Sequence, residues 1–281
     1  MHSITISDAL LMGNQKLKKV TNNYINEAFW ILSQSLNQDK ATLLLNQDNI
    51  LNEAEIKNFL DLINRRTSNE PLQLILNSVS FYNYKFITQK DVFIPRPETE
   101  LCIDIIKNYN YKFNSTLEIG CGLGCISITI ALENISSHIM AIDINEKAIS
   151  GSILNANKLQ CNNVEFIHDN FFKIKHKKKY DLIISNPPYI PISDIKKLDM
   201  NVIMHDPLSA LTDFDDGLSF YRYLAQQGHQ ILSKNGLIFV EFGGQNQKLL
   251  LRDIFENHNY KLEFFNDLNH IPRFLAAQLC N

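Results

Sequence analysis

The sequence predicts an α/β fold in which a mostly parallel sheet is covered by helices on both faces, with a small helical domain in front of it. From residue 116 onward, short apolar runs of strand length alternate with longer segments of helical periodicity. Repeats of this kind are typical of parallel strands joined by crossover helices. The first 75 residues show only the helical pattern, which sets them apart from the rest.

The N-terminal segment carries apolar residues at spacings of three and four, the period of an amphipathic helix. We expect helices to begin near Ser7 and near Asn22, and Asn52-Glu53-Ala54-Glu55 resembles a capping box that opens another. Asn69-Glu70-Pro71 ends the pattern, because proline cannot continue a helix. We therefore predict an N-terminal helical domain over residues 1–75.

Residues 79–94 are rich in aromatic and β-branched side chains, which predicts two strands with a turn at Asn83-Tyr84. Pro95 and Pro97 end this hairpin, since proline donates no hydrogen bond to a strand ladder. We predict a β-hairpin linker over residues 76–97. A helix from Glu98 to about Asn108 then opens a second domain over residues 98–281.

The second domain alternates strands and helices. The expected strands of the parallel sheet are Thr116–Ile119, Ile139–Asp143, Val164–His168, Tyr180–Ser185 and Gly236–Phe242. The expected helices are Gly124–Glu133, Glu146–Leu159, Leu218–Leu232 and Gln247–His258. A closing pair of strands, Lys261–Phe265 and Phe274–Leu279, could form a hairpin at the sheet edge.

Composition and charge argue against several classes of protein. Lys and Arg number 27 against 30 Asp and Glu, and this formal net charge of −3 disfavours stable binding of nucleic acid through its phosphates. No apolar run approaches the roughly 20 residues of a membrane helix, and the N-terminus lacks the features of a signal peptide. The five cysteines form no Cys-x-x-Cys pair and the histidines have no metal-like spacing. We expect reduced thiols, no metal and a cytoplasmic protein.

A strand runs into a helix through three closely spaced glycines, Gly120, Gly122 and Gly124. Such a loop lets backbone N–H groups approach a ligand without obstruction by Cβ atoms. A phosphate loop would need Gly-Lys-Ser/Thr, which is absent, and a dinucleotide loop would need a small residue where Cys125 stands. An acidic residue followed by Gly-x-Gly-x-Gly resembles instead the S-adenosylmethionine loop of class I methyltransferases, whose fold is Rossmann-like. A tight turn without a ligand is the alternative.

This resemblance directs attention to the ends of the next two strands. Asp143 ends the second strand, where its carboxylate can accept both ribose hydroxyls; as an alternative, it could cap the next helix. After the third strand, residues 168–172 would meet the adenine. Asn170 stands where an aromatic residue is common, so stacking would pass to Phe171 or be lost.

The motif Asn186-Pro187-Pro188-Tyr189 follows the fourth strand. Its prolines hold Asn186 extended, with the side chain directed into the crevice at the carboxyl end of the sheet. An amide –NH₂ is a poor nucleophile because its lone pair is delocalised. The Asn186 side-chain oxygen and the Pro187 carbonyl could accept its two N–H groups, and the Tyr189 ring could cover it, with no strong base required. We therefore predict methyl transfer to a planar amino group; a proline turn that only ends the strand is the alternative.

Taken together, these motifs resemble the bacterial release factor glutamine methyltransferase family. Asn-Pro-Pro-Tyr on a class I core is similar to enzymes that methylate adenine, guanine or glutamine side chains, and further segments narrow the choice. They stand in the expected order: Glu70-Pro71-Leu72-Gln73, residues 94–100, residues 206–211, residues 239–243 and Asp267 with Ile271-Pro272-Arg273.

The resemblance implies methyl transfer from S-adenosylmethionine to the side-chain amide nitrogen (N5) of the glutamine in the Gly-Gly-Gln loop of class I peptide chain release factors. The implied cofactor-binding residues are Gly120, Cys121, Gly122, Leu123, Gly124, Asp143, Asn170 and Asn186, with Cys121 and Leu123 contributing backbone atoms only. The implied catalytic residues are Asn186, Pro187 and Tyr189, and Pro188 joins them in binding the substrate. Residues 96–100 would brace the Asn-Pro-Pro-Tyr loop, and the N-terminal helices would hold the release factor away from its glutamine loop.

Three alternatives stay open at this point. The same chemistry could serve a ribosomal protein glutamine, or an exocyclic amine of DNA or RNA, although the charge disfavours nucleic acid. A cofactor-binding module without catalysis is the third. Gly243-Gly244-Gln245 matches the substrate tripeptide, but it lies between a strand and a helix, where two glycines predict an ordinary turn.

Overall fold

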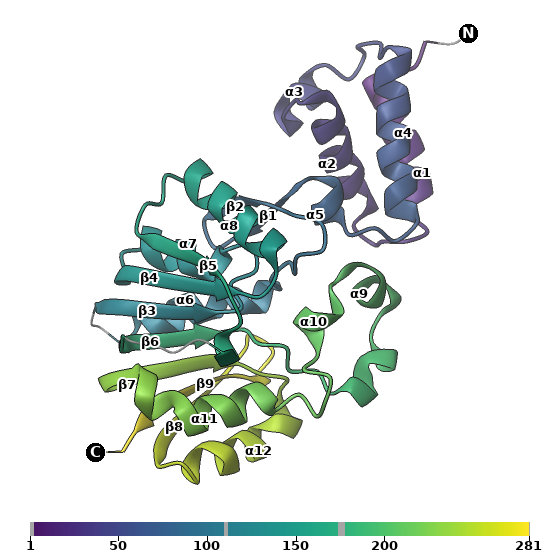
Figure 1. Cartoon of the computed structure of the whole chain (residues 1–281). Helices are drawn as coiled ribbons and strands as arrows, with labels where there is room; N and C mark the ends of the chain where they lie inside the picture. The colour runs from purple at the N-terminus through teal and green to yellow at the C-terminus, as the bar shows by residue number, and fades with distance from the viewer. Residues whose placement is uncertain (1–2, 110–111, 174–177, 281) are drawn as a thin grey trace. The chain divides into compact units, whose positions relative to one another are not determined.

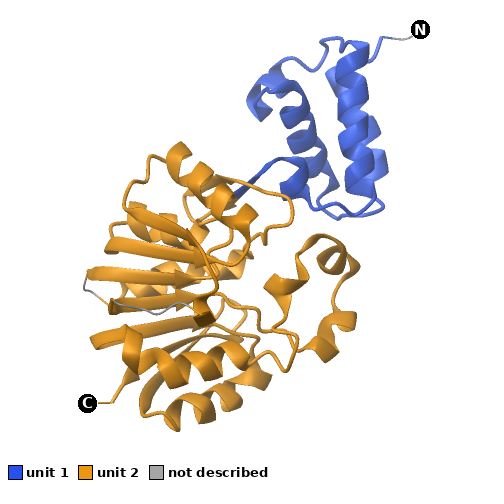
Figure 2. Cartoon of the chain, in the orientation of Figure 1, with its two compact units in different colours: residues 1–79 blue, residues 80–281 orange. Residues whose placement is uncertain are grey.

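The computed structural model describes residues 3–109, 112–173 and 178–280. The chain divides into two compact units, residues 1–79 and 80–281 (Figure 2). The boundary falls within strand β1 (Ser78–Phe81), inside the segment expected to form the hairpin linker.

The first unit is helical, as its periodicity predicts. Its helices are α1 (Ile6–Leu17), α2 (Tyr24–Leu36), α3 (Lys40–Leu45), α4 (Glu53–Thr67) and α5 (Leu72–Ile75). Helix α4 opens with the expected capping box, in which the Asn52 side chain accepts from the Glu55 N–H and the Glu55 carboxylate accepts from the Asn52 N–H. Helix α1 begins at Ile6, near Ser7 as expected, but its N-cap is Thr5, which forms a second capping box with Asp8.

The hairpin is shorter than its composition predicts. Strand β2 (Tyr84–Ile87) pairs with β1, and the turn is at Tyr82-Asn83, one residue earlier than expected, with Tyr82 at φ 56°. The second strand ends at Ile87 and not near residue 94. There the side chain of Asn155 accepts from the Ile87 N–H at 2.7 Å and donates to the Ile87 carbonyl, replacing a strand partner.

The second unit is built on a seven-stranded sheet in the order β5-β4-β3-β6-β7-β9-β8 (Figure 1). The first five strands in this order are parallel, and β9 and β8 add an antiparallel hairpin at one edge, as expected. The strands are β3 (Phe113–Ile119), β4 (Ser136–Asp143), β5 (Val164–His168), β6 (Tyr180–Ser185), β7 (Leu232–Glu241), β8 (Tyr260–Asn266) and β9 (Pro272–Leu279). The predicted α/β class with a mostly parallel sheet is confirmed.

Helices cover both faces of this sheet, with α6 on one face and α11 and α12 on the other (Figure 1). They are the short helix η1 (Pro97–Glu100), α6 (Leu101–Lys107), α7 (Cys125–Leu132), α8 (Glu146–Lys158), η2 (Phe171–Lys173), α11 (Ser219–Ile231) and α12 (Gln245–Glu256). Between β6 and α11 the chain forms three short helices that the sequence did not predict: η3 (Ile192–Lys197), α9 (Met200–His205) and α10 (Leu208–Leu211). Helices of four to six residues are too short to show a periodic apolar pattern.

The pairing register aligns the ends of the central strands. Ile119 at the end of β3 lies opposite Ser185 at the end of β6, and Ser185 lies opposite Val240 in β7. The Ser185 hydroxyl donates to the Ile119 carbonyl at 2.7 Å, which fixes this alignment. The chain order reverses between β3 and β6, the place where open α/β sheets bind ligands.

The packing of α11 against the sheet leaves no room for a side chain at Gly228. A Cβ atom there would lie 2.3 Å from the Tyr260 hydroxyl, so we expect Gly228→Ala to lower the free energy of unfolding by about 1–3 kcal/mol. Gly151→Ala in α8 is the matched control, because its Cβ would meet Gln89 at 3.5 Å, an ordinary contact. Calorimetric unfolding of the full chain should show a lower midpoint for the first variant only; equal midpoints would contradict the packing argument.

Candidate active site

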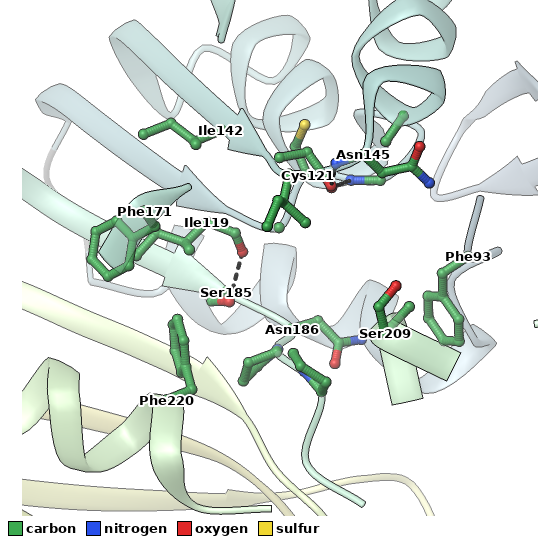
Figure 3. A pocket seen from close by; sticks show the side chains of 18 of the residues that line it. Phe93, Ile119, Cys121, Ile142, Asn145, Phe171, Ser185, Asn186, Ser209 and Phe220 are labelled. Carbon is green, nitrogen blue, oxygen red and sulfur yellow. Dashed lines mark hydrogen bonds between the residues drawn. The ribbon is translucent and has the colours of Figure 1, made fainter. Parts of the chain in front are cut away.

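A pocket of about 440 Å³ opens at the carboxyl ends of β3, β4 and β6 (Figure 3). Three segments that the sequence singled out meet in its wall: the glycine loop, the residues after β5 and the Asn-Pro-Pro-Tyr motif. Of the predicted site residues, it is lined by Gly120, Cys121, Gly122, Leu123, Asp143, Asn170, Asn186, Pro187 and Pro188. A volume of this size suits a small organic ligand.

The glycine loop adopts a backbone that favours glycine at all three positions. Gly120, Gly122 and Gly124 have φ values of +73°, +54° and +75°, in the left-handed region. Gly124 ends the loop as the N-cap of α7, where a Cβ atom would lie 3.1 Å from Ser152. The side chains of Cys121 and Leu123 are buried. The loop therefore turns mainly backbone toward the pocket.

Asp143 binds the glycine loop from the end of β4. One carboxylate oxygen accepts from the Gly122 N–H at 2.8 Å, and the other accepts from the Asn145 N–H at 2.9 Å. Burial raises the pKa of Asp143, and the backbone N–H groups partly offset this shift. The cap of α8 is Asn145, whose side chain accepts from the Lys147 N–H, so the alternative role of Asp143 as helix cap is wrong.

Glu118, just before the glycine loop, is a buried acid in the pocket wall. One of its carboxylate oxygens accepts from the Ser127 N–H at 2.9 Å, in the first turn of α7. Burial raises the pKa of Glu118 to about 8, although the hydrogen bond to Ser127 acts in the opposite direction. From the sequence, Glu118 was recognised only as the acidic residue before the glycine loop, and its place in the pocket wall was not predicted.

The segment after β5 brings aromatic side chains to the pocket. Asn170 lines it, but its side-chain oxygen accepts from the Phe172 N–H at 3.0 Å, which holds the local turn. Phe171 is buried and packs against Phe220 and Tyr223 with ring centroids 6.2 Å and 5.5 Å away. Phe171 and Phe220 both reach the pocket wall, as Figure 3 shows. Aromatic surface is therefore present although position 170 itself is not aromatic.

The Asn186 side chain lies in the pocket wall and is held from behind. Its –NH₂ group donates to the Thr99 hydroxyl at 3.3 Å, and that hydroxyl donates to the Glu241 carboxylate at 2.7 Å. The side-chain oxygen, at the other end of the carboxamide, takes no part in the hydrogen bond to Thr99. An acceptor for an incoming N–H group is thus presented at the strand end.

Tyr189 does not lie where the sequence analysis expected it. Among the described residues that line the pocket, Tyr189 is absent. Its hydroxyl donates to Glu241 at 3.3 Å, and its carbonyl accepts from the Gln247 side chain at 2.8 Å. A ring held behind the loop does not cover a group in the pocket, so this arrangement does not support the covering role, and Tyr189 acts on the loop from behind.

Thr99 and Glu241, neither of which the sequence singled out individually, hold the motif through hydrogen bonds, and Thr99 also lines the pocket. Thr99 lies within the segment expected to brace the Asn-Pro-Pro-Tyr loop, and it is the residue that makes this contact. Glu241 carried a signal that could have been used, because it is a carboxylate that follows the apolar run Leu237–Val240 at the end of β7 and precedes Phe242. Because a buried charged residue needs polar partners, an acid at such a place indicates that polar groups lie around it.

Comparison with known proteins gives the family. A family model of the PrmC N-terminal domain matches residues 8–76, and one of the methyltransferase small domain matches residues 83–213. The release factor glutamine methyltransferase of Bacillus cereus is 32% identical over 89% of this chain and 90% of its own length. The chain belongs to the release factor glutamine methyltransferase family. A second relative with this description, from Fusobacterium nucleatum, is 35% identical over 91% of this chain and 73% of its own.

Other matches extend beyond this family. A bifunctional methyltransferase of Rickettsia bellii is 34% identical over 98% of this chain but only 55% of its own length, so the chain spans about half of such relatives. The fold is similar to a ribosomal protein L11 methylase from Lactobacillus delbrueckii subsp. bulgaricus, with a TM-score of 0.50 at 15% identity over 72% of this chain and 90% of that one. The likeness to that structure supports the class I methyltransferase fold.

Two kinds of feature are absent from the described ranges. No helix within residues 3–109, 112–173 and 178–280 has both the length and the apolar character to cross a bilayer. In the same ranges no group of three or more His, Cys, Asp or Glu side chains is arranged to hold a metal ion.

The raised pKa of Glu118 predicts a pH-dependent stability. Because the pKa is about 8 in the folded chain against an ordinary 4.5, the folded state holds a proton that the unfolded state releases, and stability is lost as pH rises between these values. Glu118→Gln does not titrate, so its unfolding midpoint should fall less steeply with pH than that of the unmodified protein. Parallel midpoint curves for the two proteins would show that Glu118 is not the titrating group.

Proposed function

We propose that this protein transfers a methyl group from S-adenosylmethionine to the side-chain amide nitrogen (N5) of the glutamine in the Gly-Gly-Gln loop of class I peptide chain release factors. Membership of the family supports this assignment. The structural observation that carries it is the Asn186 carboxamide, whose –NH₂ group is bound to Thr99 and whose oxygen is left for an N–H donor in the pocket.

The pocket fits the methyl donor. The glycine backbone leaves open space, since a Cβ atom at Gly120 would meet nothing within 4 Å. Each Asp143 oxygen accepts one backbone N–H and keeps lone pairs for the ribose hydroxyls. Asn170 and Phe171 lie where the adenine would be held. When bound, S-adenosylmethionine supplies an electrophilic methyl group on a sulfonium.

Two oxygen atoms orient the acceptor. The Asn186 side-chain oxygen and the Pro187 carbonyl accept the two N–H groups of the glutamine amide, which directs the nitrogen lone pair toward the methyl carbon. As the N–C bond forms and the S–C bond breaks, positive charge grows on nitrogen, and the same oxygens stabilise it. The N-methylated amide cation then loses a proton to water, so the reaction needs no strong enzymatic base.

The two predicted domains divide the work. The helices of residues 1–75 bind the release factor at a place remote from its glutamine loop. Residues 76–97 link the two domains, and residues 98–281 bind the methyl donor and the glutamine. Gly243-Gly244-Gln245 of this chain joins β7 to α12, with Gly244 at φ +94° as the N-cap and Gln245 as the first helical residue, and we do not assign it as the substrate tripeptide.

The decisive experiment is incubation of the chain with isotopically labelled S-adenosylmethionine and a purified class I release factor, followed by mass mapping of the methylated residue. Label should appear on the glutamine of the Gly-Gly-Gln loop and vanish with a Gln→Ala release factor. Parallel reactions with ribosomal proteins and with DNA or RNA test the other acceptors, and label found only on one of these would overturn the assignment.

Asn186→Ala should lower the rate of methyl transfer by about 10²–10³, because it removes one of two acceptors for the developing charge. The variant keeps the glycine loop and Asp143, so its affinity for S-adenosylmethionine, measured by calorimetry, should fall far less than its rate. A single-turnover rate equal to that of the unmodified protein would remove Asn186 from the chemical step.

Asp143→Ala should act on the other half of the site. It removes the ribose acceptor and frees the Gly122 N–H, so the dissociation constant for S-adenosylmethionine should rise strongly. Asp253→Ala in α12 is a matched control, since Asp253 is exposed and is not among the described residues that line the pocket. Equal affinities for the two variants would mean that Asp143 does not bind the ribose.

A further inference from the structure

One buried carboxylate lies directly behind the Asn-Pro-Pro-Tyr motif. Glu241 ends β7, and because Ser185 pairs with Val240, Asn186 and Glu241 follow side by side. The side chain is 4% exposed. One oxygen accepts from the Thr99 hydroxyl at 2.7 Å and the other from the Tyr189 hydroxyl at 3.3 Å. Both oxygens are therefore directed at groups that touch or belong to the motif.

The charge of Glu241 determines the direction of the two hydrogen bonds that connect it, through Thr99, to Asn186. A carboxylate can only accept, so the Thr99 hydroxyl must donate its hydrogen to Glu241. The Thr99 oxygen then has only lone pairs to offer Asn186, which must present its –NH₂ group. The Asn186 oxygen is therefore the end of the carboxamide that is left for the N–H groups of the glutamine amide. A relay of two hydrogen bonds thus sets which end of the carboxamide serves the reaction.

We propose that Glu241 is a positioning residue that, through Thr99 and Tyr189, fixes the orientation of the Asn186 carboxamide and of the loop that carries it. The inference rests on the proposed function and deepens it. Glu241 touches neither substrate nor cofactor, since among the described residues it does not line the pocket.

Stability alone does not explain this carboxylate. Burial raises the pKa of Glu241 to about 7, with the Thr99 hydroxyl and the charge of Arg273 opposing the shift. An acid buried without a direct ion pair costs folding free energy, and an apolar or amide side chain of similar size would cost less. The titratable or charged groups that act on Glu241 or are acted on by it are Glu98, Cys102, Tyr189, Tyr221 and Arg273.

Protonation of Glu241 would allow the relay to reverse. A neutral carboxyl group can donate to Thr99, whose hydroxyl can then donate to Asn186 and draw the carboxamide oxygen toward itself. The –NH₂ group of Asn186 would then face the –NH₂ group of the glutamine, and two donors cannot form a hydrogen bond. Methyl transfer should therefore fall as pH drops through the pKa of Glu241, about 7, although no enzymatic base takes part.

The test compares Glu241→Gln, Thr99→Val and Thr99→Ser in single-turnover reactions with release factor and saturating S-adenosylmethionine. Thr99→Val has no hydroxyl and should lose on the order of 10² in rate. Glu241→Gln keeps one acceptor and must donate to its other partner, Thr99 or Tyr189, so it should also be slower than the unmodified protein. Thr99→Ser keeps the hydroxyl and should retain most of the rate. The double variant Glu241→Gln/Thr99→Val should be no slower than the worse single variant, because both act through one relay.

Two readouts separate positioning from a general loss of structure. Calorimetry should give Glu241→Gln the affinity of the unmodified protein for S-adenosylmethionine, because Glu241 is not among the described residues that line the pocket. The acidic limb of the rate should vanish in the same variant. The proposal would be overturned by any one of three results: additive losses in the double variant, a Glu241→Gln rate equal to that of the unmodified protein, or an acidic limb that persists in Glu241→Gln.

A measurement without release factor keeps this test independent of the proposed function. In NMR spectra of the full chain, the side-chain amide signal of Asn186 should shift with pH around 7 and cease to do so in Glu241→Gln and Thr99→Val. If the unmodified protein methylates no release factor yet this shift is seen, the relay stands and the proposed function fails. If methylation occurs but the signal does not respond, the relay is wrong and the function stands.

Discussion

The site depends on the register in which β3, β6 and β7 are paired. Ile119 lies opposite Ser185 and Ser185 opposite Val240, so the glycine loop, Asn186 and Glu241 emerge next to one another from three neighbouring strands. A slip of one residue would send each of these side chains to the other face of the sheet. The Ser185 hydroxyl bound to the Ile119 carbonyl holds this register at the point where it matters. The contacts among these three segments follow from this alignment.

The pocket is assembled at a cost in stability. Asp143, Glu118 and Glu241 are acids withdrawn from water, and burial raises the pKa of each. Their hydrogen-bond partners are mostly backbone N–H groups and hydroxyls, which compensate the loss of water only in part. In exchange, the Asp143 carboxylate binds the glycine loop directly, and the Glu241 carboxylate accepts from Thr99, which in turn binds the Asn186 carboxamide. These hydrogen bonds hold the loop and the carboxamide in place before any ligand arrives.

Much of the fold could be predicted because parallel strands and long amphipathic helices have strong local patterns. The bounds expected for β5 and β6 agree with the structure, and the capping box at Asn52 is present. The predictions failed where tertiary contacts decide. The hairpin ends at Ile87 because Asn155, far along the chain, satisfies its backbone, and the short helices of residues 192–211 lack any periodic pattern.

By itself, the sequence determined the α/β class, the glycine loop, the acid at the end of β4 and the Asn-Pro-Pro-Tyr motif, because each is a local pattern of residue types. Only the tertiary structure decided that Asn145 and not Asp143 caps α8, and that Tyr189 is held behind the loop. It also decided that Thr99 and Glu241, 142 positions apart, share a hydrogen bond behind Asn186. Such pairings arise from strand order and register, and these are set by the packing of the whole sheet and leave no trace in local sequence.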